Sequence, residues 1–170
     1  MNLKEFVHDI PNFPKPGITF KDISPLLRNP KATKHAVLQL AAGLDKLQVD
    51  QVIGIESRGF LLGILLAQHL DTGFTLMRKK GKLPGKVIKQ SYALEYGEDV
   101  IEVQENAIKP GQKIILHDDV LATGGTALAA KQLIEKCGAE VIECNFLIEL
   151  KFLNGREKLG KTPIKTLLDY

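Results

Sequence analysis

Apolar runs alternate with helix-like segments along this chain, and the alternation predicts a parallel sheet built from successive βα units. Stretches rich in Val, Ile and Leu indicate buried strands at 49–55, 73–77, 114–116 and 139–150, with a last edge strand at 164–168. The segment 60–67 is apolar on all sides and predicts a buried helix, whereas 127–137 has the period of a helix with one apolar face. We therefore expect an α/β fold, with an open, mainly parallel twisted sheet and helices on both faces.

The first 33 residues lack this pattern, and we expect them to form an N-terminal arm, or hood, over an α/β core of 34–170 within one domain. Residues 2–8 predict one or two helical turns. Three prolines in 10–17 predict a stiff, extended path without regular structure. A helix is expected over about 29–47, because the proline near its start is favoured in the first turn.

A basic segment and a predicted hairpin follow the second strand. Residues 78–86 hold five basic residues, two glycines and a proline, which argues against a helix and predicts a mobile loop. Strand-like pieces at 87–95 and 100–104, joined by a turn at 96–99, predict a hairpin. Residues 80–104 are thus a candidate flexible lid. Charge runs are usually solvated surface, so this loop alone does not define a ligand site.

The composition is that of an ordinary soluble globular protein, with 25% charged and 44% hydrophobic residues among 170. The net charge of +3 implies no general attraction to nucleic acid or to a membrane surface. Cys137 and Cys144 lie in apolar surroundings without metal-binding spacing, and we expect buried free thiols. The N-terminal residues do not resemble a secretory signal and 60–70 is too short to span a bilayer, so the expected location is cytoplasmic.

The stretch that says most about chemistry is 118–126, DDVLATGGT, between a predicted strand and a predicted helix. Its threonines and glycines offer backbone N–H groups at a helix start, where a phosphate binds well. Two adjacent carboxylates, Asp118 and Asp119, would disfavour a phosphate alone. They would accept hydrogen bonds from ribose hydroxyls, or hold a divalent metal through its water shell. The predicted ligand is a sugar phosphate with free hydroxyls.

Two further strand ends carry groups that suit phosphate. Glu56–Gly59 and Arg78–Lys82 should lie along the same sheet edge as the two aspartates. Arg58, Lys79 and Lys82 supply cations there. A ligand with a phosphate, a ribose and a second polyphosphate would use all three positions, and phosphoribosyl diphosphate (PRPP) has these parts.

Five segments in order carry a resemblance that covers nearly the whole chain: PNFPKPGITFKDISPLL, ESRGF, RKKGKLPG, SYALEYG and DDVLATGGT. The pattern resembles the type I phosphoribosyltransferases, and the N-terminal arm with the LEYG segment resembles the branch that acts on adenine. The resemblance implies transfer of the phosphoribosyl group of PRPP to N9 of adenine, giving AMP and diphosphate in purine salvage. It also implies a Mg²⁺ cofactor held mainly by PRPP and water, and a homodimer.

The resemblance further implies roles for single residues. The ribose hydroxyls and the 5-phosphate would be bound by Asp118, Asp119, Ala122, Thr123, Gly124, Gly125 and Thr126. The diphosphate would be bound by Ser57, Arg58, Arg78, Lys79 and Lys82, with a cis peptide bond between Glu56 and Ser57. The adenine would be held by Thr19, Phe20, Lys21 and Glu95.

Phe20 would stack on adenine, and the backbone of Thr19 and Lys21 would read its 6-amino group and N1. Glu95 would act as general acid or base near N7, so that Arg58 and Glu95 are the expected catalytic residues. Taken without the resemblance, Glu95 is a surface carboxylate in a hairpin, and Phe20 is one more core aromatic residue of the arm.

Two other functions are alternatives. A PRPP-dependent transferase for a 6-oxo purine would need a donor at O6, commonly a lysine on the fifth strand, and 141–150 offers none before Lys151. A non-catalytic PRPP-binding regulator usually adds a nucleic-acid-binding domain, for which the roughly 30 residues before the first long helix are too few. His117 departs from the aliphatic residue familiar before the acidic pair, and we expect a buried strand residue rather than a catalyst.

Overall fold

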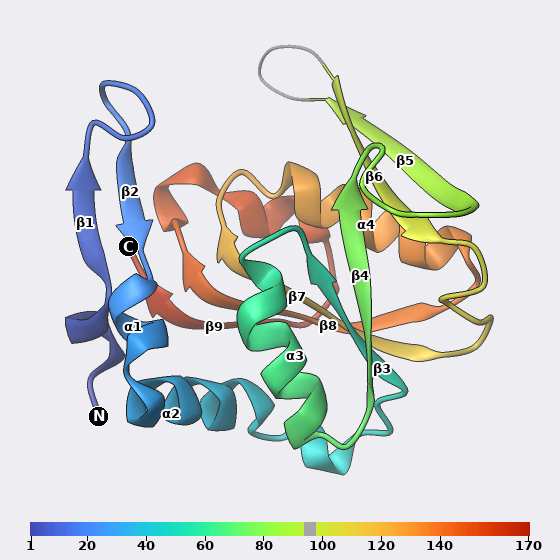
Figure 1. The fold of residues 1–170 in the computed structure, drawn as a ribbon, viewed down its shortest axis with the longest axis horizontal. Helices are drawn as coiled ribbons and strands as arrows, with labels where there is room; N and C mark the ends of the chain where they lie inside the picture. The colour runs from blue at the N-terminus through green and yellow to red at the C-terminus, as the bar shows by residue number, and fades with distance from the viewer. Residues whose placement is uncertain (94–97) are drawn as a thin grey trace.

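The computed structural model describes residues 1–93 and 98–170 and contains a seven-stranded sheet (Figure 1). The strand order is β5-β6-β4-β3-β7-β8-β9. The strands are β3 Gln51–Ile55, β4 Gly73–Lys79, β5 Val87–Ala93, β6 Glu98–Gln104, β7 Lys113–Leu121, β8 Glu140–Glu149 and β9 Ile164–Asp169. Neighbours from β4 to β9 pair in parallel, whereas β6 is antiparallel to both β4 and β5. The expected open, mainly parallel α/β sheet is confirmed.

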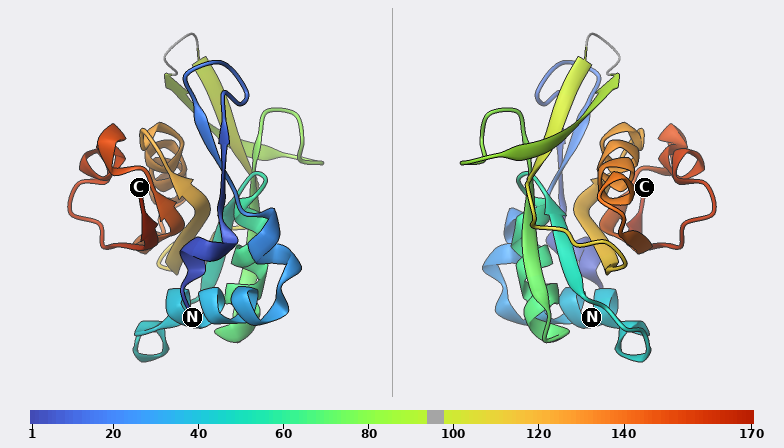
Figure 2. Two further views of the ribbon diagram at one scale, coloured as in Figure 1. Left: turned by 90° about the vertical axis from the view of Figure 1, so that its left-hand side faces the viewer. Right: turned by 90° about the vertical axis from the view of Figure 1, so that its right-hand side faces the viewer.

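Helices cover both faces of this sheet (Figure 2). They are α2 Pro30–Ala41 and α3 Gly59–His69 on one face and α4 Gly125–Lys136 on the other. β7 contributes to both cores, because successive side chains of a strand point to opposite faces. Ile115 packs in the cluster with α2 and α3, and Ile114 and Leu116 pack in the cluster with α4. Among the described residues, no helix is long and apolar enough to cross a membrane.

The N-terminal arm forms its own two-stranded sheet, which lies at the left edge of Figure 1. Its elements are η1 Leu3–Phe6, β1 His8–Pro11, β2 Thr19–Asp22 and α1 Ser24–Arg28. β1 and β2 pair antiparallel, with Ile10 opposite Phe20. The expectation that prolines exclude regular structure is therefore wrong at Ile10 and Pro11, because a strand with a free edge tolerates proline.

Two boundaries correct the sequence expectations. The helix expected to reach residue 47 ends at Ala41, because Gly43 has φ of +88° and turns the chain into the short 3-10 helix η2 Leu44–Lys46. β6 begins at Glu98, so Glu98 and Asp99 belong to a strand rather than to the turn predicted at 96–99, and residues 96 and 97 of that turn lie outside the described residues.

The basic segment also begins later than expected. Arg78 and Lys79 are the last residues of β4 rather than part of a loop, since they pair with Glu102 and Ile101 of β6. The antiparallel pairing of β5 with β6 confirms the predicted hairpin.

One face of α3 is not buried, contrary to its all-round apolar sequence. Leu62 and Leu66 are fully buried against the sheet. Leu61 and Ile64, three positions apart on the other side, are 44% and 49% exposed. The helix therefore presents apolar side chains to both the core and the surface.

A buried polar pair lies in the core directly before the acidic residues. His117 is 0% exposed, and its Nδ1 lies 3.0 Å from Oδ1 of Asn145, whose amide donates to the carbonyl oxygen of Leu40. Burial lowers the pKa of His117 from 6.5 to about 4. The expectation of a buried strand residue at this position is confirmed.

The stability of the protein should therefore depend on His117 in mildly acidic solution. The unfolded chain takes up a proton near pH 6.5, but the folded protein does so only near pH 4, so stability falls as the pH falls through this window. At about 1.4 kcal/mol per pKa unit, the free energy of unfolding of the wild type should fall over this pH window by on the order of 3 kcal/mol more than that of His117→Gln. Glutamine is chosen because it keeps a hydrogen-bonding partner for Asn145. Urea unfolding of both proteins at each pH measures the difference. If the free energies of unfolding of the two proteins change with pH in the same way, this account is wrong.

Candidate active site

The acidic pair stands at the carboxyl end of β7, inside the strand rather than after it. Asp119 is 6% exposed, and its Oδ2 lies 2.5 Å from Nη2 of Arg58. Arg58 directly precedes α3, and a Cβ placed at Gly59 would lie only 2.8 Å from Oδ1 of Asp118. Because β3 and β7 are parallel neighbours, their carboxyl ends meet at one sheet edge. The structure thus brings together Arg58 and the two aspartates, as predicted.

Burial shapes the electrostatics of the two carboxyl groups. Burial, and then the charge of Asp119, raise the pKa of Asp118 well above 3.8. Burial also raises the pKa of Asp119, although the charge of Arg58 opposes this effect. The pair therefore retains a proton more readily than two exposed aspartates would. Positive charge that develops nearby would stabilise the fully ionised pair.

The segment Ala122–Thr126, which we call the phosphate loop, connects β7 to α4. Gly124 is the N-cap of α4, with φ of +77° and no side chain to cap the helix, and the first turn holds no acidic residue. The first N–H groups of α4 are therefore free of side-chain caps. A small pocket of about 80 Å³ is lined by this loop together with Asp118. Such a helix start suits an anion the size of a phosphate.

Arg58 also contacts the N-terminal arm. Its guanidinium lies over the ring of Phe20, 4.5 Å from the centroid, and its Nη1 donates to the carbonyl oxygen of Lys21 at 3.4 Å. The edge-to-face ring of Phe13 lies 5.2 Å from Phe20. Phe20 thus packs on Phe13 within the arm and is connected to the acidic pair through Arg58, and its role with adenine is still a prediction.

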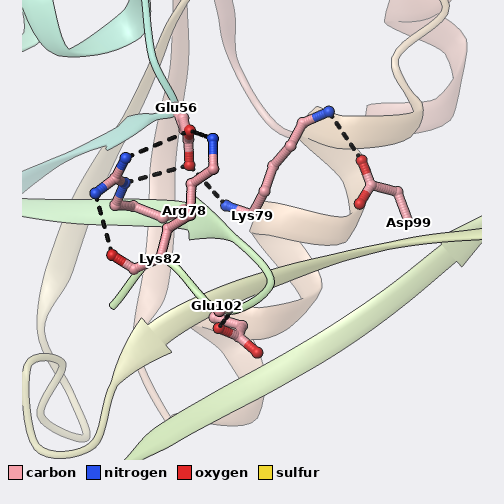
Figure 3. A network of polar contacts seen from close by, with 7 residues as sticks. Glu56, Arg78, Lys79, Lys82, Asp99 and Glu102 are labelled. Atoms are coloured by element: carbon pink, nitrogen blue, oxygen red, sulfur yellow. Dashed lines mark hydrogen bonds and ion pairs between the residues drawn. The ribbon is translucent and has the colours of Figure 1, made fainter. Parts of the chain in front are cut away.

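The predicted diphosphate cations form a network with carboxylates (Figure 3). Glu56 pairs with Nε of Arg78 at 3.2 Å and with Nζ of Lys82 at 2.5 Å, and it accepts a hydrogen bond from the backbone N–H of Lys79 at 2.9 Å. Burial raises the pKa of Glu56, but these donors outweigh it and hold the pKa below 4.5. The cations lie together at the sheet edge, as predicted, and Glu56 neutralises part of their charge.

A second polar chain joins the hairpin to the phosphate loop. Nζ of Lys79 lies 3.0 Å from Oδ2 of Asp99, which accepts a hydrogen bond from the hydroxyl of Tyr92 at 3.1 Å. The hydroxyl of Thr126 donates to that of Tyr92 at 3.5 Å. β5 and β6 therefore contact both the cations and the phosphate loop.

The remaining predicted residues are placed as follows. Ser57 lies between Glu56 and Arg58, after a cis peptide bond, and Thr19 is exposed at the start of β2. Glu95 lies outside the described residues, so its expected role is still a prediction. Within 1–93 and 98–170, no three His, Cys, Asp or Glu side chains gather to form a direct metal site.

Sequence reasoning missed the carboxylates that pair with the cations. Glu56 and Lys82 are 26 positions apart, and Lys79 and Asp99 are 20 apart, so no local pattern reveals these contacts. A usable signal was the position of Glu56 at the same strand end as Arg58.

Comparison with known proteins identifies the family. Residues 23–164 match the phosphoribosyl transferase domain. The adenine phosphoribosyltransferase of Christiangramia forsetii is 51% identical over 170 residues, covering 100% of this chain and 99% of that protein. The crystal structure of the enzyme from Rhodothermus marinus matches with a TM-score of 0.95 and 49% identity, covering 99% of this chain and 96% of that one.

A third match was solved with ligands. It is the adenine phosphoribosyltransferase of Saccharomyces cerevisiae, in complex with D-2,5-dideoxy-2,5-imino-altritol 1,6-bisphosphate and adenine. Its TM-score is 0.92 at 46% identity, covering 98% of this chain and 96% of that one. The chain belongs to the phosphoribosyl transferase family. Within that family it falls among the adenine phosphoribosyltransferases, as the sequence resemblance indicated.

The network around Glu56 generates a stability prediction. Glu56→Gln removes the charge that pairs with Arg78 and Lys82, whose side chains are 30% and 50% exposed. We therefore expect the free energy of unfolding to fall by about 1–2 kcal/mol at pH 7. Because the pKa of Glu56 is lowered by folding, its contribution is present above pH 4.5 and is lost as the pH falls through the lower folded-state pKa. Urea unfolding of both proteins at pH 7 and pH 3.5 measures the difference between their free energies of unfolding. If this difference is not smaller at pH 3.5, the proposed contribution of the Glu56 charge is wrong.

Proposed function

We propose that this protein transfers the phosphoribosyl group of PRPP to N9 of adenine, giving AMP and diphosphate in purine salvage. The observation that carries the proposal is the position of Arg58, which contacts Asp119 on one side and Phe20 and Lys21 on the other. One side chain therefore joins the candidate ribose site to the candidate base site. The relatives named adenine phosphoribosyltransferase, with the yeast structure that contains adenine, support this choice of base.

In the reaction, N9 of adenine forms a bond to C1 of the ribose while the bond from C1 to the diphosphate oxygen breaks. Positive charge builds on the ribose in the transition state, and negative charge builds on the leaving diphosphate. Asp118 and Asp119 lie where the ribose would bind, so their ionised form stabilises the developing cation. The phosphate loop holds the 5-phosphate, and the fixed position of C1 relative to the base supplies much of the rate.

The leaving group is stabilised by cations at the end of β4. Arg78, Lys79 and Lys82 are held at this edge by Glu56 and Asp99, and they would exchange these partners for diphosphate oxygens. Arg58 and Ser57 complete the proposed diphosphate site.

The paired carboxylates fit a divalent cation bound through water, because Asp118 lines the phosphate-loop pocket and Asp119 follows it directly in β7. When bound with PRPP, Mg²⁺ would neutralise negative charge on the diphosphate. Asp118 and Asp119 are the residues that would orient its water shell, and the protein's own cations supply the remaining charge.

The base would be held by the N-terminal arm. Phe20 would stack on adenine, the backbone of Thr19 and Lys21 would read its Watson–Crick edge, and Glu95 would act as general acid or base near N7. Residues 80–104 would close over the bound substrates and exclude water from the reactive ribose cation. The contact of Tyr92 with Thr126 supports such a closure, because it already joins the hairpin to the phosphate loop.

Asp119→Asn tests the proposed mechanism. The variant keeps the shape of the side chain but removes the charge that faces the developing cation, so we expect turnover of adenine to fall on the order of 100-fold. Asp45→Asn, at an exposed carboxylate in η2, is the control and should have wild-type turnover. Wild-type turnover in Asp119→Asn, with unchanged melting temperature, would rule out this role.

A panel of bases in the same assay tests the choice of substrate. With PRPP and Mg²⁺, adenine should be converted to AMP, and hypoxanthine, guanine, xanthine and orotate should react far more slowly. Preference for a 6-oxo purine would favour the first alternative function. Binding of PRPP without turnover of any base would favour the regulator.

A homodimer and a cytoplasmic location complete the proposal. Leu61 and Ile64 on α3 form an exposed apolar face that a second copy of the chain would cover. Cys137 and Cys144 are free thiols, which fits a reducing compartment.

The dimer is tested by Ile64→Glu, which places a charge in the proposed interface. We expect the wild type to sediment as a dimer and the variant as a folded monomer, because burying an unpaired carboxylate opposes association. If Ile64→Glu is still a dimer, the interface does not include Ile64. If the wild type is a monomer, the proposed homodimer is wrong.

A further inference from the structure

A segment distant in sequence packs against the phosphate loop. Gly155 begins the 3-10 helix η4 Gly155–Leu159, which contacts α4 (Figure 1). A Cβ at Gly155 would lie 2.0 Å from the carbonyl oxygen of Ala122 and 2.8 Å from the backbone nitrogen of Gly124. A Cβ at Gly124 would in turn lie 2.3 Å from the carbonyl oxygen of Gly155. The two backbones therefore touch with no side chain between them, and glycine is needed at residue 155 for space.

An ion pair holds the segment that contains Gly155. Nε of Arg156 donates to Oε1 of Glu149 at 3.0 Å, and Nη2 donates to Oε2 at 2.6 Å. Glu149 is 4% exposed and also accepts a hydrogen bond from the hydroxyl of Thr166 at 3.2 Å. The hydrogen bonds from Arg156 lower the pKa of Glu149 below 4.5, so the carboxylate is charged at neutral pH. A two-bond contact of this kind fixes direction as well as distance.

Glu149 is also connected to the other end of the phosphate loop. It lies opposite Leu121, the last residue of β7, in the parallel pairing of β7 with β8. The backbone N–H of Leu150 donates to the carbonyl oxygen of Leu121 at 2.9 Å. Glu149 thus contacts both sides of the loop, with its backbone pairing to Leu121 before the loop and its carboxylate holding the segment that packs against the loop.

We infer that Glu149 and Arg156 are positioning residues for the 5-phosphate of the substrate. They act through Gly155, which sets the course of the phosphate loop and hence the direction of its N–H groups. Neither side chain lines the pocket formed by that loop. The inference rests on the proposed function, because it takes the 5-phosphate of PRPP to be the ligand of the loop.

The expected effect is on binding more than on chemistry. The 5-phosphate is present in PRPP, in the transition state and in AMP, and the reaction does not change it. A misplaced loop therefore weakens all three states alike, which raises the KM for PRPP and leaves kcat nearly unchanged. Adenine and diphosphate carry no 5-phosphate, so their own binding should be spared.

Arg156→Ala tests the inference. We expect the KM for PRPP and the Kd for ribose 5-phosphate, measured by calorimetry, to rise about tenfold, while kcat stays within about twofold. The KM for adenine and the Kd for diphosphate should not change. Arg156→Lys keeps the charge but loses the two-bond geometry and should give an intermediate rise. Glu135→Gln, which removes the ion pair with Lys131 on α4, is the matched control and should leave all constants unchanged.

The outcomes separate this inference from the function it rests on. If the wild type is active and both Arg156 variants bind ribose 5-phosphate as tightly as it does, the inference is overturned and the proposed function stands. An equal loss of affinity for ribose 5-phosphate, diphosphate and adenine also overturns it, because that is general loosening of the fold. A wild type that binds no ribose 5-phosphate and forms no AMP overturns both. If Arg156→Ala does not fold, Arg156→Lys carries the same comparison.

Discussion

The contact between Arg58 and Asp119 joins the parts of the molecule that a substrate has to bridge. A buried carboxylate without a partner is costly, on the order of several kcal/mol, and Asp119 is almost completely buried. The same guanidinium that neutralises it stacks on Phe20 and donates to the backbone of Lys21. One side chain therefore connects the acidic pair to the N-terminal arm. The arm, although it forms a separate sheet, is part of the site.

The number of partners divides the ion pairs of the site into two kinds, because Asp119 and Glu56 are equally buried, with side chains 8% exposed. Asp119 pairs with Arg58, and breaking that contact would leave a buried carboxylate without its cation, which is expensive. Glu56 pairs with both Arg78 and Lys82, so one cation can move away while the other still neutralises the carboxylate. Glu56 keeps the backbone N–H of Lys79 as a donor when either cation moves away. The first contact is suited to fix geometry, and the second set is suited to exchange.

Local patterns in the sequence were sufficient for the framework of the site. The apolar runs located β3 and β7, and parallel pairing then required their following residues to meet at one edge. The end of α2 was missed because Leu44 and Leu47 continue the apolar helical period past Gly43, whose positive φ stops the helix. Periodicity reports which face of an element is buried, and it does not report the backbone angle of one glycine.

The partners of the charged residues could not be read from the sequence, for a different reason. The pairing of Glu56 with Lys82, and the packing of Gly155 on the phosphate loop, depend on how distant turns of the chain are placed in space. A turn motif such as Asn154-Gly155 predicts the turn but not its neighbour. Roles drawn from resemblance, such as adenine stacking by Phe20, depend on contacts with substrates and are still predictions.

The proposed reaction gives this division of the site a physical reason. The 5-phosphate is chemically unchanged from PRPP to AMP, so a loop held rigidly by the β7–β8 pairing and by Gly155 serves substrate and product equally. The diphosphate must first be held and then leave. Cations without other partners would bind that product tightly and slow its release, and they would repel one another once it had gone. Glu56 and Asp99 offer them a second set of partners, which lowers the cost of releasing diphosphate and restores the site for the next substrate.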